Sequence, residues 1–247
     1  MARIRLDLLL VERGLFESRA KAVEAIEAGR VVIDDRTASK PSEMVDEAAA
    51  ITASAAHPWV GRGALKLDHA LALWPIGVDG RVVLDVGAST GGFTEVCLSR
   101  GARRVYAVDV GRGQLHARIK ADPRIIDLQA TDARKLDRGL IPDPIDLIVC
   151  DVSFIGLAKT LPAALALAGP DADLVALVKP QFEVGPARVG RGGVVKDETD
   201  RQSALQGVKD FLETSGWTTQ AVADSPIQGA DGNHEFLLWA RLATSPQ

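Results

Sequence analysis

The chain has 247 residues, of which 47% are apolar and 25% are charged, and its formal net charge is −4. This composition excludes a chain that is disordered over most of its length. The acidic balance also argues against a protein that binds nucleic acid with its whole surface. No apolar run reaches the ~18 residues of a membrane span and nothing resembles a signal peptide. The two cysteines have no metal-site or disulfide spacing, which fits a reducing cytoplasm.

Residues 1–59 predict a small α+β domain. An apolar stretch over residues 5–12 predicts a first helix, and Ser18 is placed to cap a second helix over residues 19–28. A β-branched run at 30–33 predicts the first strand of a pair. The expected content of this domain is therefore two helices followed by two strands.

A linker is predicted after the strand pair. Between Thr52 and Pro58 the residues become small and polar without an apolar period, which is typical of a linker. We therefore expect one domain over residues 1–59 and a second over residues 60–247.

Beyond the linker, apolar strands and helices alternate. This alternation predicts an α/β domain with a Rossmann-like, mostly parallel sheet that helices cover on both faces. The two last strands are joined by a Gly-rich loop and predict a terminal antiparallel hairpin. Predicted strands cover 81–86, 105–110, 125–128, 147–151, 174–178, 218–222 and 235–241. One helix is predicted to begin near residue 91, and three further helices are predicted over 113–121, 158–167 and 200–215.

The loop after the first of these strands is rich in glycine, which lets a backbone approach a ligand closely. Ligands of open parallel sheets bind at the carboxyl ends of the strands, where this loop is predicted to lie. Ser89 stands where a dinucleotide fingerprint needs glycine for the pyrophosphate. Asp85 supplies a carboxylate suited to the positively charged end of S-adenosylmethionine. The loop therefore predicts an S-adenosylmethionine site in preference to an NAD site or a purely structural turn.

Further residues complete the predicted cofactor site. Asp109 ends the next strand at the spacing where a carboxylate accepts hydrogen bonds from ribose hydroxyls, a feature common to NAD and S-adenosylmethionine proteins. Asp132 is expected either to bind the adenine amino group or to cap a helix. The predicted cofactor-binding residues are Asp85, Gly87, Ala88, Ser89, Thr90, Gly91, Gly92, Phe93, Asp109, Val110, Asp132, Ala133 and Asp151.

Several motifs extend over nearly the whole chain: DVGASTGGFTEV, AVDVG, CDVSFI, VKPQFEVG and NHEFLLW. Together they resemble the TlyA (haemolysin A) family of ribosomal RNA 2'-O-methyltransferases. The segment RLDLLLVERGLFESRAKAVEAIEAGRVVID is similar to an RNA-binding module first described in a small-subunit ribosomal protein. The resemblance implies S-adenosylmethionine-dependent methylation of cytidine 2'-hydroxyls in large-subunit 23S rRNA, small-subunit 16S rRNA, or both. The brief ends of the chain favour the shorter form of the family, which is associated with large-subunit rRNA alone.

The resemblance also implies a catalytic tetrad of Lys66, Asp151, Lys179 and Glu235. A ribose hydroxyl is a poor nucleophile until its proton is removed, so the protein must supply a base. On the resemblance, Lys179 is the base, Lys66 and Glu235 align the ribose, and Asp151 bridges them beside the methyl group. From the residues alone, Asp151 and Lys179 each follow an apolar strand, where such sheets hold ligands. Without the motifs, solvent-exposed side chains would be the better explanation of Lys66 and Lys179, and Glu235 could equally lie on the surface of the hairpin.

Basic residues of both domains are the candidates for binding RNA, because phosphate contacts supply much of the affinity. Phe154 is expected to stack on an extruded cytosine, with a core phenylalanine as the alternative. The predicted RNA-binding residues are Arg3, Arg5, Arg19, Lys21, Lys40, Arg62, Arg134, Phe154 and Arg188. No metal site is expected.

Three other functions are less well supported. A non-catalytic RNA-binding or ribosome-assembly factor would keep the cofactor pocket, but the intact tetrad argues against it. Ser89 disfavours an NAD-dependent oxidoreductase. A membrane-active haemolysin has no apolar span to support it.

Overall fold

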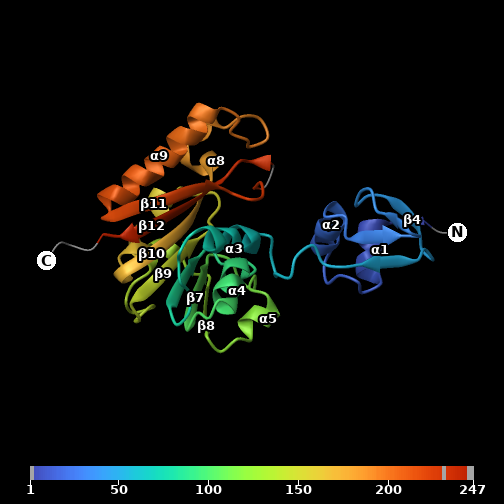
Figure 1. The fold of residues 1–247 in the computed structure, drawn as a ribbon, viewed down its shortest axis with the longest axis horizontal. Helices are drawn as coiled ribbons and strands as arrows, with labels where there is room; N and C mark the ends of the chain where they lie inside the picture. The colour runs from blue at the N-terminus through green and yellow to red at the C-terminus, as the bar shows by residue number, and fades with distance from the viewer. Residues whose placement is uncertain (1–2, 230–231, 244–247) are drawn as a thin grey trace. The chain divides into compact units, whose positions relative to one another are not determined.

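The computed structural model describes residues 3–229 and 232–243. The chain divides into two compact units, Met1–Pro58 and Trp59–Gln247 (Figure 1). In the described part of the chain, no helix is long and apolar enough to cross a membrane.

The N-terminal unit packs two helices against short antiparallel strands. The helices are α1 (Leu6–Glu12) and α2 (Arg19–Glu27), and Ser18 caps α2 by accepting a hydrogen bond from the Lys21 N–H. The strands are β1 (Arg3–Arg5), β2 (Val31–Ile33), β3 (Arg36–Thr37), β4 (Met44–Asp46) and β5 (Ile51–Ala53). The buried core of this unit includes Leu6, Leu10, Ala22, Ala25, Ile26, Val31 and Ile33.

The strands of this unit are more numerous than the sequence indicated. β2 and β3 form the expected pair, joined by Asp34 and Asp35 at φ values of 44° and 66°. β5 pairs with the other edge of β2, so Thr52 lies in a strand and the predicted start of the linker was wrong. β1 also pairs with β4. Strands of three residues are too short for a periodic pattern, and these pairings join residues far apart in the chain.

The described residues of the C-terminal unit form a seven-stranded sheet in the order β11-β12-β10-β9-β6-β7-β8 (Figure 1). β6 to β10 pair in parallel, whereas β12 is antiparallel to both β10 and β11. The mostly parallel sheet and its terminal hairpin are therefore confirmed. The strands are β6 (Val82–Val86), β7 (Arg104–Asp109), β8 (Ile125–Gln129), β9 (Ile145–Cys150), β10 (Ala168–Val178), β11 (Trp217–Asp224) and β12 (Phe236–Leu242).

Helices cover both faces of this sheet. α3 (Gly63–Leu73) and α4 (Gly92–Ser99) pack on one face. α6 (Leu157–Thr160), α7 (Pro162–Leu165) and α9 (Glu198–Thr214) pack on the other. Because helices cover both faces, every residue of β6 is buried, and all of them except Asp85 are apolar. The remaining helical turns are α5 (Ala117–Lys120), η1 (Ala133–Lys135), α8 (Pro180–Glu183) and η2 (Pro186–Arg188).

Two helices differ from their predicted extents. The helix expected over 113–121 begins only at Ala117, because Gly113 has a φ of 63° and His116 caps α5 through its side chain. The helix expected over 158–167 is divided into α6 and α7 at Pro162, which has no N–H to continue the hydrogen-bond ladder.

Candidate active site

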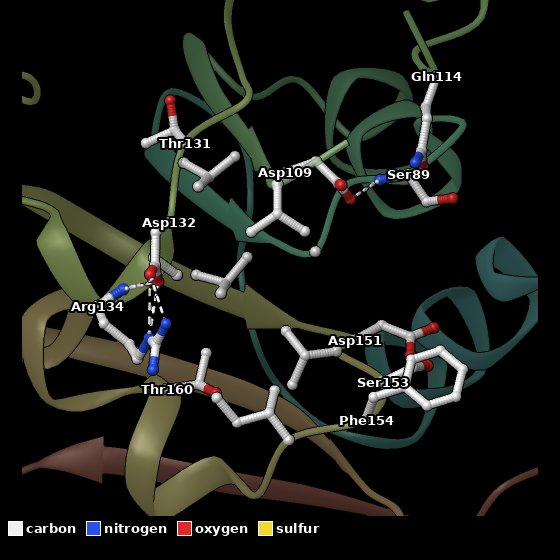
Figure 2. A pocket seen from close by; sticks show the side chains of 17 residues that line it. Ser89, Asp109, Gln114, Thr131, Asp132, Arg134, Asp151, Ser153, Phe154 and Thr160 are labelled. Carbon is white, nitrogen blue, oxygen red and sulfur yellow. Dashed lines mark hydrogen bonds and ion pairs between the residues drawn. The ribbon is translucent and has the colours of Figure 1, made fainter. Parts of the chain in front are cut away.

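The order in which successive strands are added to the sheet reverses at β6, and a cavity of about 380 Å³ lies at this point (Figure 2). β6 pairs with β7 on one side and β9 on the other, so the loops after these strands diverge and leave a crevice. We call this space the large cavity. A second space of about 210 Å³, here called the lysine cavity because Lys179 lines it, shares four lining residues with the first, Gly87, Ser89, Asp151 and Ser153.

The turn after β6 is held tightly between its neighbours. The N–H groups of Gly87 and Ala88 donate to the Val108 carbonyl at 2.9 and 3.0 Å. Gly87 has a φ of +88°, and a Cβ at this position would lie 2.5 Å from the carbonyl oxygen of Asp151. Glycine is required here because the end of β9 passes directly against the backbone.

Ser89 and Asp109 meet at the wall of the large cavity, as Figure 2 shows. Ser89 has a φ of +47°, and its N–H donates to Asp109 Oδ2 at 2.8 Å. The N–H of Gly111 donates to Asp109 Oδ1 at 2.7 Å. Two backbone donors therefore fix this carboxylate, whose remaining lone pairs suit the hydroxyls of a ribose.

Residues 90–93, the second half of the loop, pack against neighbouring elements and also line the site. A Cβ on Gly91, which has a φ of +95°, would lie 2.8 Å from the Leu115 side chain. A Cβ on Gly92 would lie 3.1 Å from the backbone nitrogen of Ala64 in α3. Thr90, Gly92 and Phe93 line the lysine cavity. The glycines therefore let α4 approach the start of α3.

Asp85 lies behind the cavity walls and not on them. It is fully buried, and its Oδ2 accepts a hydrogen bond of 2.6 Å from the Thr94 hydroxyl. Burial raises the pKa of Asp85 to about 7, although the Thr94 hydrogen bond opposes this. Asp85 Oδ1 has no hydrogen-bond partner among the described residues. The structure therefore does not bring Asp85 to the cofactor space as the sequence predicted, and its hydrogen bond to Thr94 instead joins β6 to the first turn of α4.

The opposite wall combines apolar and charged groups. Val110 is 74% exposed, an unusual position for a valine, and it offers an apolar surface to the large cavity beside Ala133. Asp132 caps η1 and pairs with Arg134 at 2.7 Å, so the cap considered for it from the sequence is present. The Arg134 hydrogen bonds lower the pKa of Asp132 to about 2. This apolar and acidic lining suits an adenosine, so the cavity fits S-adenosylmethionine.

The four tetrad residues form two ion pairs. Lys66 Nζ lies 2.6 Å from Glu235 Oε2, and Lys179 Nζ lies 2.6 Å from Asp151 Oδ1. Lys66, Lys179 and Glu235 are buried, which contradicts the alternative of solvent-exposed side chains. Asp151 remains partly open, and its side chain is 19% exposed.

Strand register brings these residues together. Val178 pairs with Phe236, so Lys179, just after β10, and Glu235, just before β12, lie at adjoining strand ends. Val86 pairs with Cys150, which places Asp151 beside Gly87. Lys66 comes from α3, whose first residue, Gly63, lies beside the Asp151 carboxylate. The tetrad is thus assembled from four elements.

The basic residues predicted to bind RNA are largely engaged within the protein. Arg5 and Arg19 both pair with the buried Asp7, at 2.9 and 2.8 Å. Further contacts of this kind are Arg3 with the Met44 carbonyl, Lys21 with Glu24, Arg134 with Asp132 and Arg188 with Asp200. The side chains of Arg5 and Arg19 nevertheless remain 40% and 57% exposed. Arg62 lines the lysine cavity, and Lys40 is exposed in the N-terminal unit.

Phe154 is 90% exposed, so it is not the core phenylalanine that was considered as an alternative. Its φ of +69° turns the side chain outward, and its ring lies 5.3 Å from that of Phe182. In Figure 2, Phe154 and Ser153 lie at one end of the large cavity, and Asp132 and Arg134 at the other.

Sequence reasoning missed Ser153, Thr131, Val152, Ile155 and Thr160, which also line the large cavity. Ser153 lies in the CDVSFI motif, so the sequence did contain a signal for it. The apolar residues gave no signal, because a valine on a cavity wall and one in the core have the same sequence pattern.

This sheet, with a cofactor cavity where its strand order reverses, is that of the S-adenosylmethionine-dependent methyltransferases. A solved methyltransferase of this class from Mesorhizobium loti shares the fold with a TM-score of 0.53 at 19% identity, over 72% of this chain and 98% of its own. The FtsJ-like methyltransferase model matches residues 59–242, and the S4 domain model matches residues 4–51.

Similarity to individual proteins extends over both units. The 16S/23S rRNA (cytidine-2'-O)-methyltransferase TlyA of Mycobacterium tuberculosis is 48% identical over 98% of this chain and 91% of its own. Hemolysin A of Brachyspira hyodysenteriae is 34% identical over 95% and 98%. A solved structure from Streptococcus thermophilus has a TM-score of 0.78 at 37% identity, over 100% and 91%. The chain belongs to the TlyA family of FtsJ-like methyltransferases.

Proposed function

We propose that this protein transfers the methyl group of S-adenosylmethionine to the 2'-hydroxyl of a cytidine in ribosomal RNA. The observation that carries the proposal is the pair of buried lysine–carboxylate contacts beside a cavity that fits the cofactor. The printed names of the TlyA relatives support the substrate class. This substrate also implies action in the cytoplasm, where ribosomes are found.

Different residues are proposed to bind the ribose, the adenine and the methionine end of the cofactor. Asp109 would hold the ribose hydroxyls, and Val110 and Ala133 would pack against the adenine, with Asp132 near its amino group. Gly87, Ala88 and Ser89 would support the methionine end, where the lysine cavity begins. When bound, S-adenosylmethionine supplies a methyl group already activated by its positively charged sulfur. The protein therefore has to orient and deprotonate the ribose hydroxyl.

Lys179 is the proposed general base. It lines the lysine cavity next to Asp151, and in its neutral form its nitrogen accepts the proton of the 2'-hydroxyl. The deprotonated ribose oxygen would then be the nucleophile for the methyl group that the bound cofactor supplies. Lys66 and Glu235 form a buried pair that would support the alignment of the ribose.

RNA would be held by both units. Arg5 and Arg19 project from the S4 domain, where Asp7 fixes their guanidinium groups for contacts with phosphates. Arg62 at the lysine cavity is suited to the phosphate of the target nucleotide. Phe154 is the proposed stacking partner of the extruded base.

The experiment is methyl transfer from tritiated S-adenosylmethionine to purified 50S and 30S subunits and naked rRNA, followed by mapping of 2'-O-methylated nucleotides. We expect label on a cytidine of 23S rRNA. Label on 16S rRNA as well would match the dual name of the Mycobacterium tuberculosis relative, whereas the Campylobacter jejuni relative is named for 23S rRNA alone. Cofactor binding without transfer to either subunit or rRNA would contradict the proposal and favour a non-catalytic assembly factor.

A further inference from the structure

Ser153 contacts the proposed base directly. Lys179 Nζ donates a hydrogen bond of 2.9 Å to Ser153 Oγ, in addition to its 2.6 Å contact with Asp151 Oδ1. Ser153 lines both the large cavity and the lysine cavity. The serine hydroxyl therefore lies where the cofactor space and the lysine meet.

These two contacts constrain the lysine nitrogen. A neutral amine has a tetrahedral nitrogen that carries one carbon, two hydrogens and one lone pair. The hydrogen bond to Ser153 fixes the direction of one hydrogen. The contact with Asp151 Oδ1 is an ion pair without hydrogen-bond geometry, so it attracts the second hydrogen but does not fix its direction. Together the two contacts favour the remaining vertex for the lone pair. With Asp151 alone, the amine would still rotate about the Cε–Nζ bond, and its lone pair would sweep through many directions.

The loop that carries Ser153 is itself held against the element that follows Lys179. Glu183 of α8 accepts a hydrogen bond of 2.9 Å from the Leu157 N–H through Oε1. A Cβ on Gly156 would lie 3.0 Å from Glu183 Oε2, so this contact depends on glycine. Phe154 also contacts Phe182 of α8 through their rings. Ser153 thus stands at the start of a loop that is attached to α8 at Phe154 and again at Leu157.

We propose that Ser153 is a positioning residue that directs the lone pair of Lys179 toward the ribose 2'-hydroxyl. This inference rests on the proposed function, because it assigns a task to Ser153 in that same reaction. The proton leaves the hydroxyl oxygen and arrives at Lys179 Nζ, where it becomes the third N–H of the ammonium group. Ser153 keeps its hydrogen bond throughout and exchanges no proton.

The test compares Ser153→Ala and Ser153→Thr with the unaltered full-length chain in the rRNA methylation assay. Loss of the hydroxyl should lower kcat by about 10- to 100-fold, the effect expected of a misoriented reacting group. The KM for RNA and the Kd for S-adenosylmethionine should stay close to their original values. Ser153→Thr retains a hydroxyl on Cβ and should restore most of kcat. Ser215→Ala, which removes an exposed hydroxyl at the end of α9, is the matched control and should change nothing.

Unchanged kcat in Ser153→Ala would overturn the role of Ser153 and leave the proposed function intact. Equal losses in the alanine and threonine variants, or a loss confined to KM or to cofactor binding, would also overturn it. Thermal unfolding of both variants identifies any general loss of structure, and the threonine variant remains informative if the alanine variant unfolds. Absence of methyl transfer by the unaltered chain would instead overturn the proposed function, and the inference about Ser153 with it.

Discussion

The two lysines of the tetrad have different surroundings, and this difference separates their proposed roles. Lys179 lines the lysine cavity and contacts both Asp151 and Ser153. Lys66 contacts Glu235 and lines neither of the two described cavities. The proton acceptor has to reach the substrate, so the cavity-lining lysine is the better base.

Lys179→Ala should abolish methyl transfer without weakening cofactor binding. Loss of a general base reduces rates by about 10²- to 10⁴-fold. Single-turnover transfer to rRNA and calorimetric titration with S-adenosylmethionine would measure the two effects separately. Lys120→Ala, at an exposed lysine of α5, is the control. Parallel loss of transfer and cofactor binding would show that Lys179 is a cofactor residue and not the base.

Phe154→Ala tests the proposed base stacking. Because the side chain is 90% exposed, its removal should leave the melting temperature nearly unchanged. Stacking of one base on an aromatic ring contributes about 1–3 kcal/mol, so transfer efficiency on rRNA should fall by roughly 5- to 150-fold. Phe154→Trp should retain most activity. A large decrease in melting temperature, with transfer unaffected, would show that the ring serves the fold.

At the scale of elements, the site depends on loops that follow neighbouring strands. The turn after β6 lies against the end of β9, where Gly87 meets the carbonyl of Asp151. The same Asp151 carries the ion pair to Lys179 at the end of β10. A shift of the β6 turn is therefore expected to affect both cavities.

Gly87→Ala should weaken both the fold and the site. The new Cβ would meet a backbone oxygen at 2.5 Å, and the residue would have to keep a φ of +88°. A strained backbone of this kind costs about 1–3 kcal/mol. Thermal unfolding and titration with S-adenosylmethionine would measure the losses. Gly77→Ala is the matched control, because no atom lies within 4 Å of its Cβ position. Equal behaviour of the two variants would contradict the close approach of β6 and β9.

At the scale of the whole molecule, the two units carry carboxylates with opposite pKa shifts. In the N-terminal unit, hydrogen bonds from Arg5 and then Arg19 lower the pKa of Asp7 to about 2, against the effect of burial. In the C-terminal unit, burial raises the pKa of Asp85 to about 7. A depressed pKa stabilises the fold at neutral pH, whereas a raised pKa destabilises it there.

Without cofactor, the C-terminal unit should lose stability as pH rises from about 4 to about 7. The folded state retains the Asp85 proton over this window, while the unfolded chain has lost it near pH 4. The contribution amounts to as much as about 4 kcal/mol. Calorimetric melting of the unaltered chain and Asp85→Asn at pH 5 and pH 8 would measure it. We expect a smaller difference between the two pH values in the variant, and an equal difference would disprove the role of Asp85.

The N-terminal unit should respond in the opposite direction. Asp7 stabilises it above about pH 4, and this contribution is lost as pH falls through about 2. Circular dichroism during acid titration would follow this transition. Asp7→Asn should move it toward neutral pH and lower stability at pH 7 by about 1–2 kcal/mol through weaker hydrogen bonds to Arg5 and Arg19. An unaltered acid transition in the variant would contradict this.

The amino-acid sequence alone was enough to predict the class of fold and the glycine loop, and the family motifs singled out the four residues proposed as the tetrad. Apolar strands, turn residues and short motifs express these features over a few adjacent positions. It did not reveal the pairing of β1 with β4, because each strand has only three residues and lies far from its partner. It also could not decide whether Phe154 was buried or exposed, since the outward turn depends on a φ of +69°.

Which charges meet depends on how the chain folds in three dimensions. Lys66 and Glu235 are 169 positions apart, and their contact depends on α3 packing beside the end of β12. The same packing buried both residues, so each needs the other to compensate its charge. Ser153 became part of the site in the same way, because strand register placed the end of β9 beside the end of β10. Residue types are local properties of a chain, whereas burial and partnership depend on the whole fold.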